Sequence, residues 1–338
     1  MPSHRPLRHY RRYPRRSRTP RALRWFAAVV LLLLLLLPLL AGCAPHSAET
    51  ERGTGHSEAA FTLPDIPPLL VTPQARASYL AAHYWQRFNF RDTALISRPE
   101  LTEQALANFL DILPHVPLAE AQSSLTAMMD SAAVDSAMYA HFMELSRKYL
   151  YEPNSPFRNE EYYIPVLRHV IASPRLGEPD KARPTFRLDM ALKNRPGDVA
   201  ADFAYTLADG TVGSLQQIKS SYTLLFFNSP DCEDCRRVKD YMAASEHLAG
   251  MTGEGSASRP RLVILAVYPD EDIELWRAAA YPPCMLNARD ASQAINRHRF
   301  YDLKAVPCLY LLDADKRVLL KDVTVEHVEL YLREHARN

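Results

Sequence analysis

Apolar residues recur at intervals of three and four from Thr72 to about residue 192, a spacing typical of helices that bury one face. Thr72 can cap the first helix, and Pro73 fits its first turn. Five further helices are predicted at about 98–113, 118–130, 134–151, 159–173 and 177–192. No strand pattern lies between them, so we expect residues 73–199 to form an all-α domain.

The pattern changes after the pair Pro196-Gly197, which is typical of a turn. Beyond it, short apolar runs alternate with helical segments, and Asp209-Gly210 predicts a hairpin. Strands are predicted at 203–207, 211–212, 222–227, 261–267, 308–312 and 317–322. Helices are predicted at 214–218, from residue 232 to about 247, through Trp276, at 291–298 and at the C-terminal end. We therefore expect residues 200–338 to form an α/β domain.

The N-terminal leader has the composition of a signal peptide. Nine arginines precede Trp25, an apolar run continues to Leu40, and Ala41, Gly42 and Cys43 follow. The ending resembles the lipobox of bacterial lipoproteins, which implies cleavage before Cys43 and acylation of that cysteine. The alternative is an uncleaved membrane anchor, although a run of about 16 to 18 residues is short for a span of about 20.

This leader sets the expected organisation and location of the chain. We expect residues 1–42 to be the signal peptide and residues 43–72, which are rich in Pro, Ser, Thr and Gly, to be a flexible tether. The rest of the protein would then be lipid-anchored in the cell envelope. The sequence leaves open whether it is held at the inner or the outer membrane, and whether it faces the periplasm or the outside.

The formal charge of +1 hides an asymmetry. Nine of the 40 basic residues belong to the leader, so the chain beyond it carries 31 basic against 39 acidic residues, a net charge of −8. An acidic protein is a poor partner for nucleic acid, and we exclude that class of function.

Cys232 and Cys235 form a CxxC motif directly after the apolar run 222–227 and a turn that contains Pro230. The motif opens a predicted helix, whose unpaired N–H groups and positive dipole end stabilise a thiolate on the first cysteine. This arrangement suits thiol-disulfide exchange. A CxxC by itself can also be half of a zinc site, so the motif needs support from elsewhere in the chain.

Pro307 provides that support, because it lies at the start of the apolar strand 308–312. Proline cannot donate to a strand ladder, and at a strand start it marks an edge, a bulge or a cis peptide bond.

With both features in place, residues 200–338 resemble the thioredoxin fold, and in particular its extracytoplasmic TlpA-like branch. The resemblance implies a mixed central sheet flanked by helices, with Cys232 as the attacking thiol and Cys235 as the resolving thiol. It also implies that Val306-Pro307 is a cis-proline step facing the cysteines, with Val306 and Cys308 positioning the substrate. Residues 73–199 resemble the helical domain of unknown function that precedes such domains in lipoproteins of gut-dwelling bacteria.

Three departures from the family pattern bear on the chemistry. Asp231 replaces the tryptophan that often precedes the first cysteine, Phe226 occupies the position of a buried acid, and Cys308 replaces a small hydroxyl residue. The acids at 231, 233 and 234 disfavour a thiolate, so we expect a Cys232 pKa less depressed than in strong oxidants. This favours a disulfide reductase that needs no bound cofactor, takes electrons from a membrane donor and acts on disulfide-bearing envelope proteins.

Other functions remain open at this stage. The thioredoxin-like domain could be a scaffold in a binding lipoprotein, or Cys232 could attack a peroxide. A zinc site built from all four thiols, with Cys284 and Cys308, is disfavoured because only one CxxC exists. The aromatic loop 149–158 is interpreted as a rigid corner that buries tyrosines, with a docking surface as the alternative.

Overall fold

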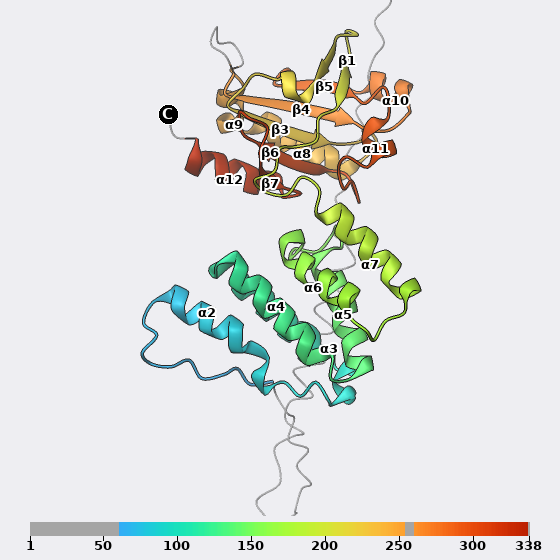
Figure 1. The fold of residues 1–338 in the computed structure, drawn as a ribbon. Helices are drawn as coiled ribbons and strands as arrows, with labels where there is room; N and C mark the ends of the chain where they lie inside the picture. The colour runs from blue at the N-terminus through green and yellow to red at the C-terminus, as the bar shows by residue number, and fades with distance from the viewer. Residues whose placement is uncertain (1–60, 254–259, 337–338) are drawn as a thin grey trace, which may run out of the picture. The chain divides into compact units, whose positions relative to one another are not determined.

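The protein is described from a computed structural model, which covers residues 61–253 and 260–336 (Figure 1). Cys43, the leader and most of the predicted tether lie outside the described residues. Residues Ala59–Asn338 form one compact unit. Within the described ranges, no helix has the length and apolar character that crossing a membrane requires.

Six α-helices occupy the N-terminal part of this unit, as the spacing of apolar residues predicted. They are α2 (Pro73–His83), α3 (Pro99–Ile112), α4 (Leu118–Ala132), α5 (Ser136–Leu150), α6 (Glu160–Ala172) and α7 (Glu178–Ala191). Side-chain caps define several starts: the Thr72 hydroxyl accepts from the Ala75 N–H at 3.2 Å, and the Asn159 side chain accepts from the Tyr162 N–H at 3.3 Å. The helices enclose one apolar core, in which Phe109 and Phe142 are fully buried.

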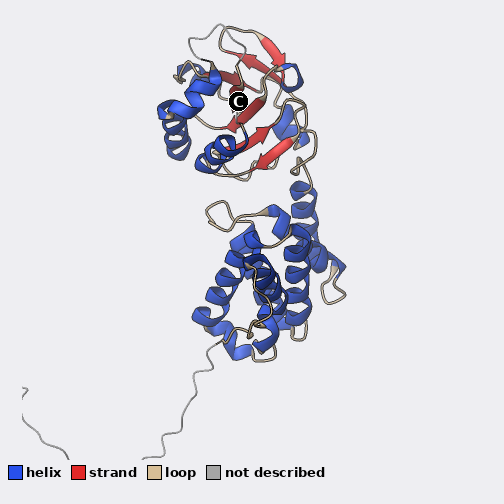
Figure 2. Ribbon diagram, turned by 90° about the vertical axis from the view of Figure 1, so that its left-hand side faces the viewer, coloured by secondary structure: helices blue, strands red, loops and turns tan. Residues whose placement is uncertain are grey.

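All strands of the described chain belong to a mixed seven-stranded sheet in its C-terminal part (Figure 2). They are β1 (Ala204–Leu207), β2 (Val212–Ser214), β3 (Tyr222–Phe227), β4 (Leu262–Tyr268), β5 (Met285–Arg289), β6 (Cys308–Leu312) and β7 (Val318–Lys321). Their order is β2-β1-β5-β4-β3-β6-β7. Strand β4 runs parallel to β3 and β5, and the other pairs are antiparallel.

Helices cover both faces of this sheet. Apolar residues of α8 (Glu233–Ala244), α9 (Glu246–Thr252) and α12 (Val325–His335) pack with one face, where Phe226 and Leu309 point. The opposite face carries Phe227 and Tyr310 and is covered by η5 (Leu215–Gln217) and α11 (Ala294–His298). The remaining helix of this part, α10 (Ile273–Ala278), precedes β5. The expected α/β class with a mixed sheet is confirmed.

The structure differs from the prediction at two elements. Strand β5 was not predicted, because Met285–Arg289 contains no β-branched residue and buries only two of its five side chains. The single helix expected to run to residue 247 is two helices, since Ser245 leaves the helical conformation and its hydroxyl caps α9 by accepting from the Leu248 N–H at 3.2 Å.

Candidate functional site

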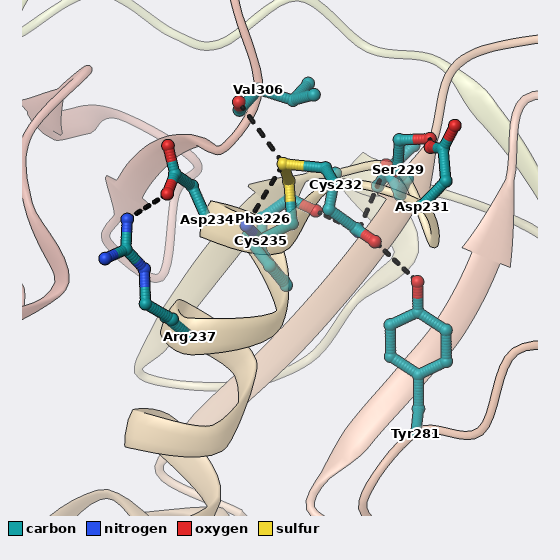
Figure 3. Close-up of a disulfide and its surroundings, with 11 residues drawn as sticks. Phe226, Ser229, Asp231, Cys232, Asp234, Cys235, Arg237, Tyr281 and Val306 are labelled. Carbon is teal, nitrogen blue, oxygen red and sulfur yellow. Dashed lines mark hydrogen bonds and ion pairs between the residues drawn. A yellow bond between two sulfur atoms is a disulfide. The ribbon is translucent and has the colours of Figure 1, made fainter. Parts of the chain in front are cut away.

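The structure places the CxxC motif at the N-terminus of α8, directly beyond the end of the central strand β3. Cys232 is the N-cap residue, and it forms a disulfide with Cys235 (Figure 3). Cys232 is half-buried, whereas Cys235 is 3% exposed and packs with the face of the sheet covered by α8. One sulfur is therefore accessible to a second molecule and the other is protected.

Two backbone groups approach the outer sulfur. The Cys235 N–H donates to Cys232 Sγ at 3.1 Å, and the Val306 carbonyl oxygen lies 3.6 Å from the same sulfur. The Val306-Pro307 peptide bond is cis. In the reduced protein, the Cys235 N–H and the helix dipole would stabilise a thiolate on Cys232. The structure thus brings together four predicted site residues, Cys232, Cys235, Val306 and Pro307. The catalytic roles of Cys232, Cys235 and Pro307 and the positioning role of Val306 stay predictions.

Two of the three acidic residues near Cys232 pair with arginines that the sequence argument left out. Asp234 pairs with Arg237, and Glu233 pairs with Arg236 at 3.4 Å. Each arginine lies one helical turn after its acid, and both pairs are exposed. Their positive charges offset the effect of the two acids on the Cys232 thiol, so the acidic surroundings disfavour a thiolate less than the sequence alone indicated.

The turn beneath the disulfide is held by neutral polar groups. Asn228 is buried, and its side-chain N–H donates to the Phe226 carbonyl at 2.9 Å. The Tyr281 hydroxyl donates to Asn228 Oδ1 at 2.5 Å, and burial, followed by the nearby Tyr268, raises the pKa of Tyr281 to about 12. Phe226 itself is fully buried. Sequence reasoning did not identify Asn228 or Tyr281, although a polar residue at the end of an apolar strand was a usable signal.

Cys308 lies elsewhere than its neighbour Pro307 suggested. It is the first residue of β6, is 1% exposed and packs on the opposite sheet face from Cys235. Its Sγ donates to Asp322 Oδ1 at 3.3 Å, and burial together with that carboxylate raises the pKa of the Cys308 thiol well above its usual value. A substrate at Cys232 has no access to this sulfur, so the side chain does not line the site.

The other cysteine considered, Cys284, is half-buried and packs beside the apolar cluster that contains Cys235. Among residues 61–253 and 260–336, no group of three or more His, Cys, Asp or Glu residues is arranged to hold a metal ion.

Comparison with known proteins shows the family to which this chain belongs. A thioredoxin-like protein from Bacteroides caccae is 45% identical, with a TM-score of 0.77, over 81% of this chain and 98% of its own. This chain belongs to the thioredoxin-like family. Residues 42–194 match the model of a domain of unknown function, DUF5106, so the thioredoxin-like protein carries this domain before its sheet.

Two further solved structures match only part of the chain. The C-terminal domain of an uncharacterized protein from Bacteroides fragilis is 39% identical over 41% of this chain and 98% of its own, with a TM-score of 0.39. The thioredoxin domain of a thiol-disulfide oxidoreductase from Bacteroides vulgatus is 17% identical over 42% of this chain and 99% of its own, with a TM-score of 0.33. No curated protein matches this chain. The family and the helical domain of unknown function are confirmed, and the TlpA-like branch stays a prediction.

Proposed function

We propose that the protein is a membrane-anchored extracytoplasmic thiol-disulfide oxidoreductase of the TlpA-like branch, which acts as a disulfide reductase. The observation that carries this proposal is the disulfide between half-buried Cys232 and buried Cys235 at the N-terminus of α8, next to Val306 and Pro307. The lipid anchor would be Cys43, and the substrates would be envelope proteins that carry disulfides.

The proposed reaction starts when reduced Cys232 attacks one sulfur of a substrate disulfide as a thiolate. A new S–S bond forms, the substrate's own S–S bond breaks, and its second sulfur leaves and takes up a proton. Cys235 then loses its proton and attacks Cys232, which closes the Cys232–Cys235 disulfide and releases the first substrate sulfur as a thiol. Each cycle gives two electrons to the substrate, and a two-electron donor in the membrane would restore the dithiol.

The surroundings of Cys232 favour this direction. The helix end and the Cys235 N–H stabilise the thiolate, but Glu233 and Asp234 offset the charges of Arg236 and Arg237, so these four residues add no net positive charge. In a strong oxidant, the reduced dithiol form is stabilised, so the disulfide is easily reduced. A dithiol without such stabilisation has a more stable disulfide form. A measured reduction potential of about −120 mV, as in a strong oxidant, would contradict the reductase assignment.

Insulin reduction with dithiothreitol as the electron source tests the activity. We expect the wild-type protein to accelerate the precipitation of reduced insulin chains and Cys232→Ser to lose this effect. Cys308→Ser is the matched control, because its sulfur is buried away from the site, and it should keep the activity. No acceleration by the wild-type protein would favour the scaffold alternative, full activity of Cys232→Ser would contradict the role of Cys232, and faster oxidation by peroxide than by disulfides would favour a peroxidase.

A further inference from the structure

A cleft of about 500 Å³ opens beside the disulfide. Its lining includes Asp234 and Val306, which also adjoin the cysteine pair (Figure 3). The rest of the lining is mixed: Pro307, Val238 and Val323 are apolar and partly exposed, Leu309 and Val325 are buried, and Arg237, Tyr241, Thr324 and Glu326 add exposed polar groups. The cleft therefore continues the surface on which a disulfide would meet Cys232.

The length of the cleft suits a chain rather than a small disulfide. Along α8 it extends from Asp234 to Tyr241, which is about 10 Å at 1.5 Å per helical residue. An extended polypeptide covers that distance with about three residues. The volume also falls within the range of about 300–1,000 Å³ that is usual for ligand sites.

One part of the lining comes from the helical domain. Pro153, Asn154 and Arg158 lie in the segment between α5 and α6, and all three line the cleft. Asn154 is exposed. The aromatic loop that was interpreted as a rigid corner thus contributes to a surface next to the cysteines.

Arg158 fixes this segment against the sheet domain. Its guanidinium donates to the Pro153 carbonyl at 3.1 Å and to the Asp322 carbonyl at 3.1 Å, and it pairs with the Asp322 carboxylate at 2.9 Å. Asp322 directly precedes Val323, another lining residue. One side chain therefore holds the Pro153 turn and the segment after β7 together.

A second set of contacts holds the same two regions. Glu160 pairs with Lys304 and, at 2.6 Å, with Lys321, and all three side chains are buried. Lys304 precedes the Ala305-Val306-Pro307 segment of the cleft, and Lys321 precedes Asp322. Buried ion pairs thus join the helical domain to residues next to two segments that line the cleft.

We propose that Pro153 and Asn154 form a substrate-selecting wall, and that the cleft receives an extended polypeptide segment whose apolar side chain lies beside the cysteine joined to Cys232. This inference rests on the proposed exchange reaction. It assigns the helical domain a part in choosing protein substrates over small disulfides. Small disulfides need only the sulfur and its immediate surroundings.

Filling the cleft tests the wall directly. Asn154→Trp places a large side chain in the cleft, and Asn108→Trp, on the exposed face of α3, is the matched control. Exchange is measured on the full protein with insulin and with a small aromatic disulfide. We expect Asn154→Trp to lower kcat/KM for insulin roughly tenfold and to leave the small disulfide unchanged. Asn108→Trp should behave as wild type on both.

Several results would overturn the proposal that Pro153 and Asn154 select the substrate. They are an unchanged rate of Asn154→Trp with insulin, equal losses on both disulfides, or a loss as large in the control Asn108→Trp. A wild-type protein inactive on both disulfides would instead remove the proposed function, and this inference with it.

A pair of oxidised peptides tests the chemistry of the occupant. The peptides differ only in the residue beside the cysteine, which is leucine in one and aspartate in the other. We expect wild type to reduce the leucine peptide faster and Asn154→Trp to lose that preference. Equal wild-type rates for the two peptides would overturn the assignment of an apolar side chain to the cleft.

Discussion

Glu160 provides the sharpest test of how the helical domain is joined to the sheet domain. It is the first residue of α6, and its carboxylate pairs with Lys304 and Lys321. The three side chains are 6%, 8% and 6% exposed. Asp302 and Asp322 complete the surroundings of Lys304, at 3.0 and 3.8 Å from its ammonium.

The expected cost of Glu160→Gln follows from this burial. Burial raises the pKa of Glu160, but Lys321 and Lys304 outweigh that effect and the pKa is lowered. The amide would leave two buried ammonium groups with one carboxylate fewer. Removing one partner of a buried ion pair costs about 3–5 kcal/mol, and we expect the free energy of unfolding to fall by that amount.

Urea unfolding followed by circular dichroism measures this cost. Glu178→Gln is a matched control, because Glu178 is also the first residue of its helix but is 90% exposed and pairs with Lys181 at 3.5 Å. Its loss should stay below about 1 kcal/mol. In Glu160→Gln/Lys321→Gln the charges balance again, so the double change should cost less than the sum of the single changes. Equal costs for Glu160→Gln and Glu178→Gln would refute the reasoning.

Three further outcomes are expected. Because the pKa of Glu160 is lowered in the folded protein, its ion pairs add to the free energy of unfolding above the unfolded pKa of about 4.3, and this stabilisation is lost as the pH falls through the folded pKa. Below about pH 4.3, wild type should therefore lose stability more steeply than Glu160→Gln. Equal slopes in urea unfolding would contradict this. Cys308 should react with iodoacetamide only after unfolding, as read by mass spectrometry, and labelling of the folded protein would be the opposite result. Cys43→Ala should abolish acylation and move the protein to the aqueous phase in detergent partitioning, whereas retention in the detergent phase would support an uncleaved anchor.

Sequence periodicity located the helices and most strands, because each of them buries a distinct apolar face. Strand β5 was missed since its place depends on parallel pairing with β4, where Met285 lies opposite Ile264 and Ala288 opposite Val267. Such pairing joins residues far apart in the chain and leaves little trace in a five-residue segment. The break at Ser245 was readable in principle, because serine is a common N-cap.

The same contrast holds for the site. Cys232, Cys235 and Pro307 were identified because a CxxC at a helix start and a proline at a strand start are local signals. The cleft wall and the ion pairs that hold it were not identified. Glu160 and Lys304 are 144 positions apart, and the sequence near either residue gives no sign that the two are in contact. The position of the Cys308 side chain could not be predicted without the strand register, which places it on the sheet face opposite Cys235.

The most direct test of the central claim is the mass of the covalent adduct formed by Cys235→Ser with an oxidised protein substrate. Without the resolving thiol, the account predicts a mixed disulfide on Cys232 that peptide mapping locates there and that dithiothreitol releases. Cys232→Ser/Cys235→Ser should give none. Absence of the adduct, or its location on Cys284 or Cys308, would contradict a reaction that begins at Cys232.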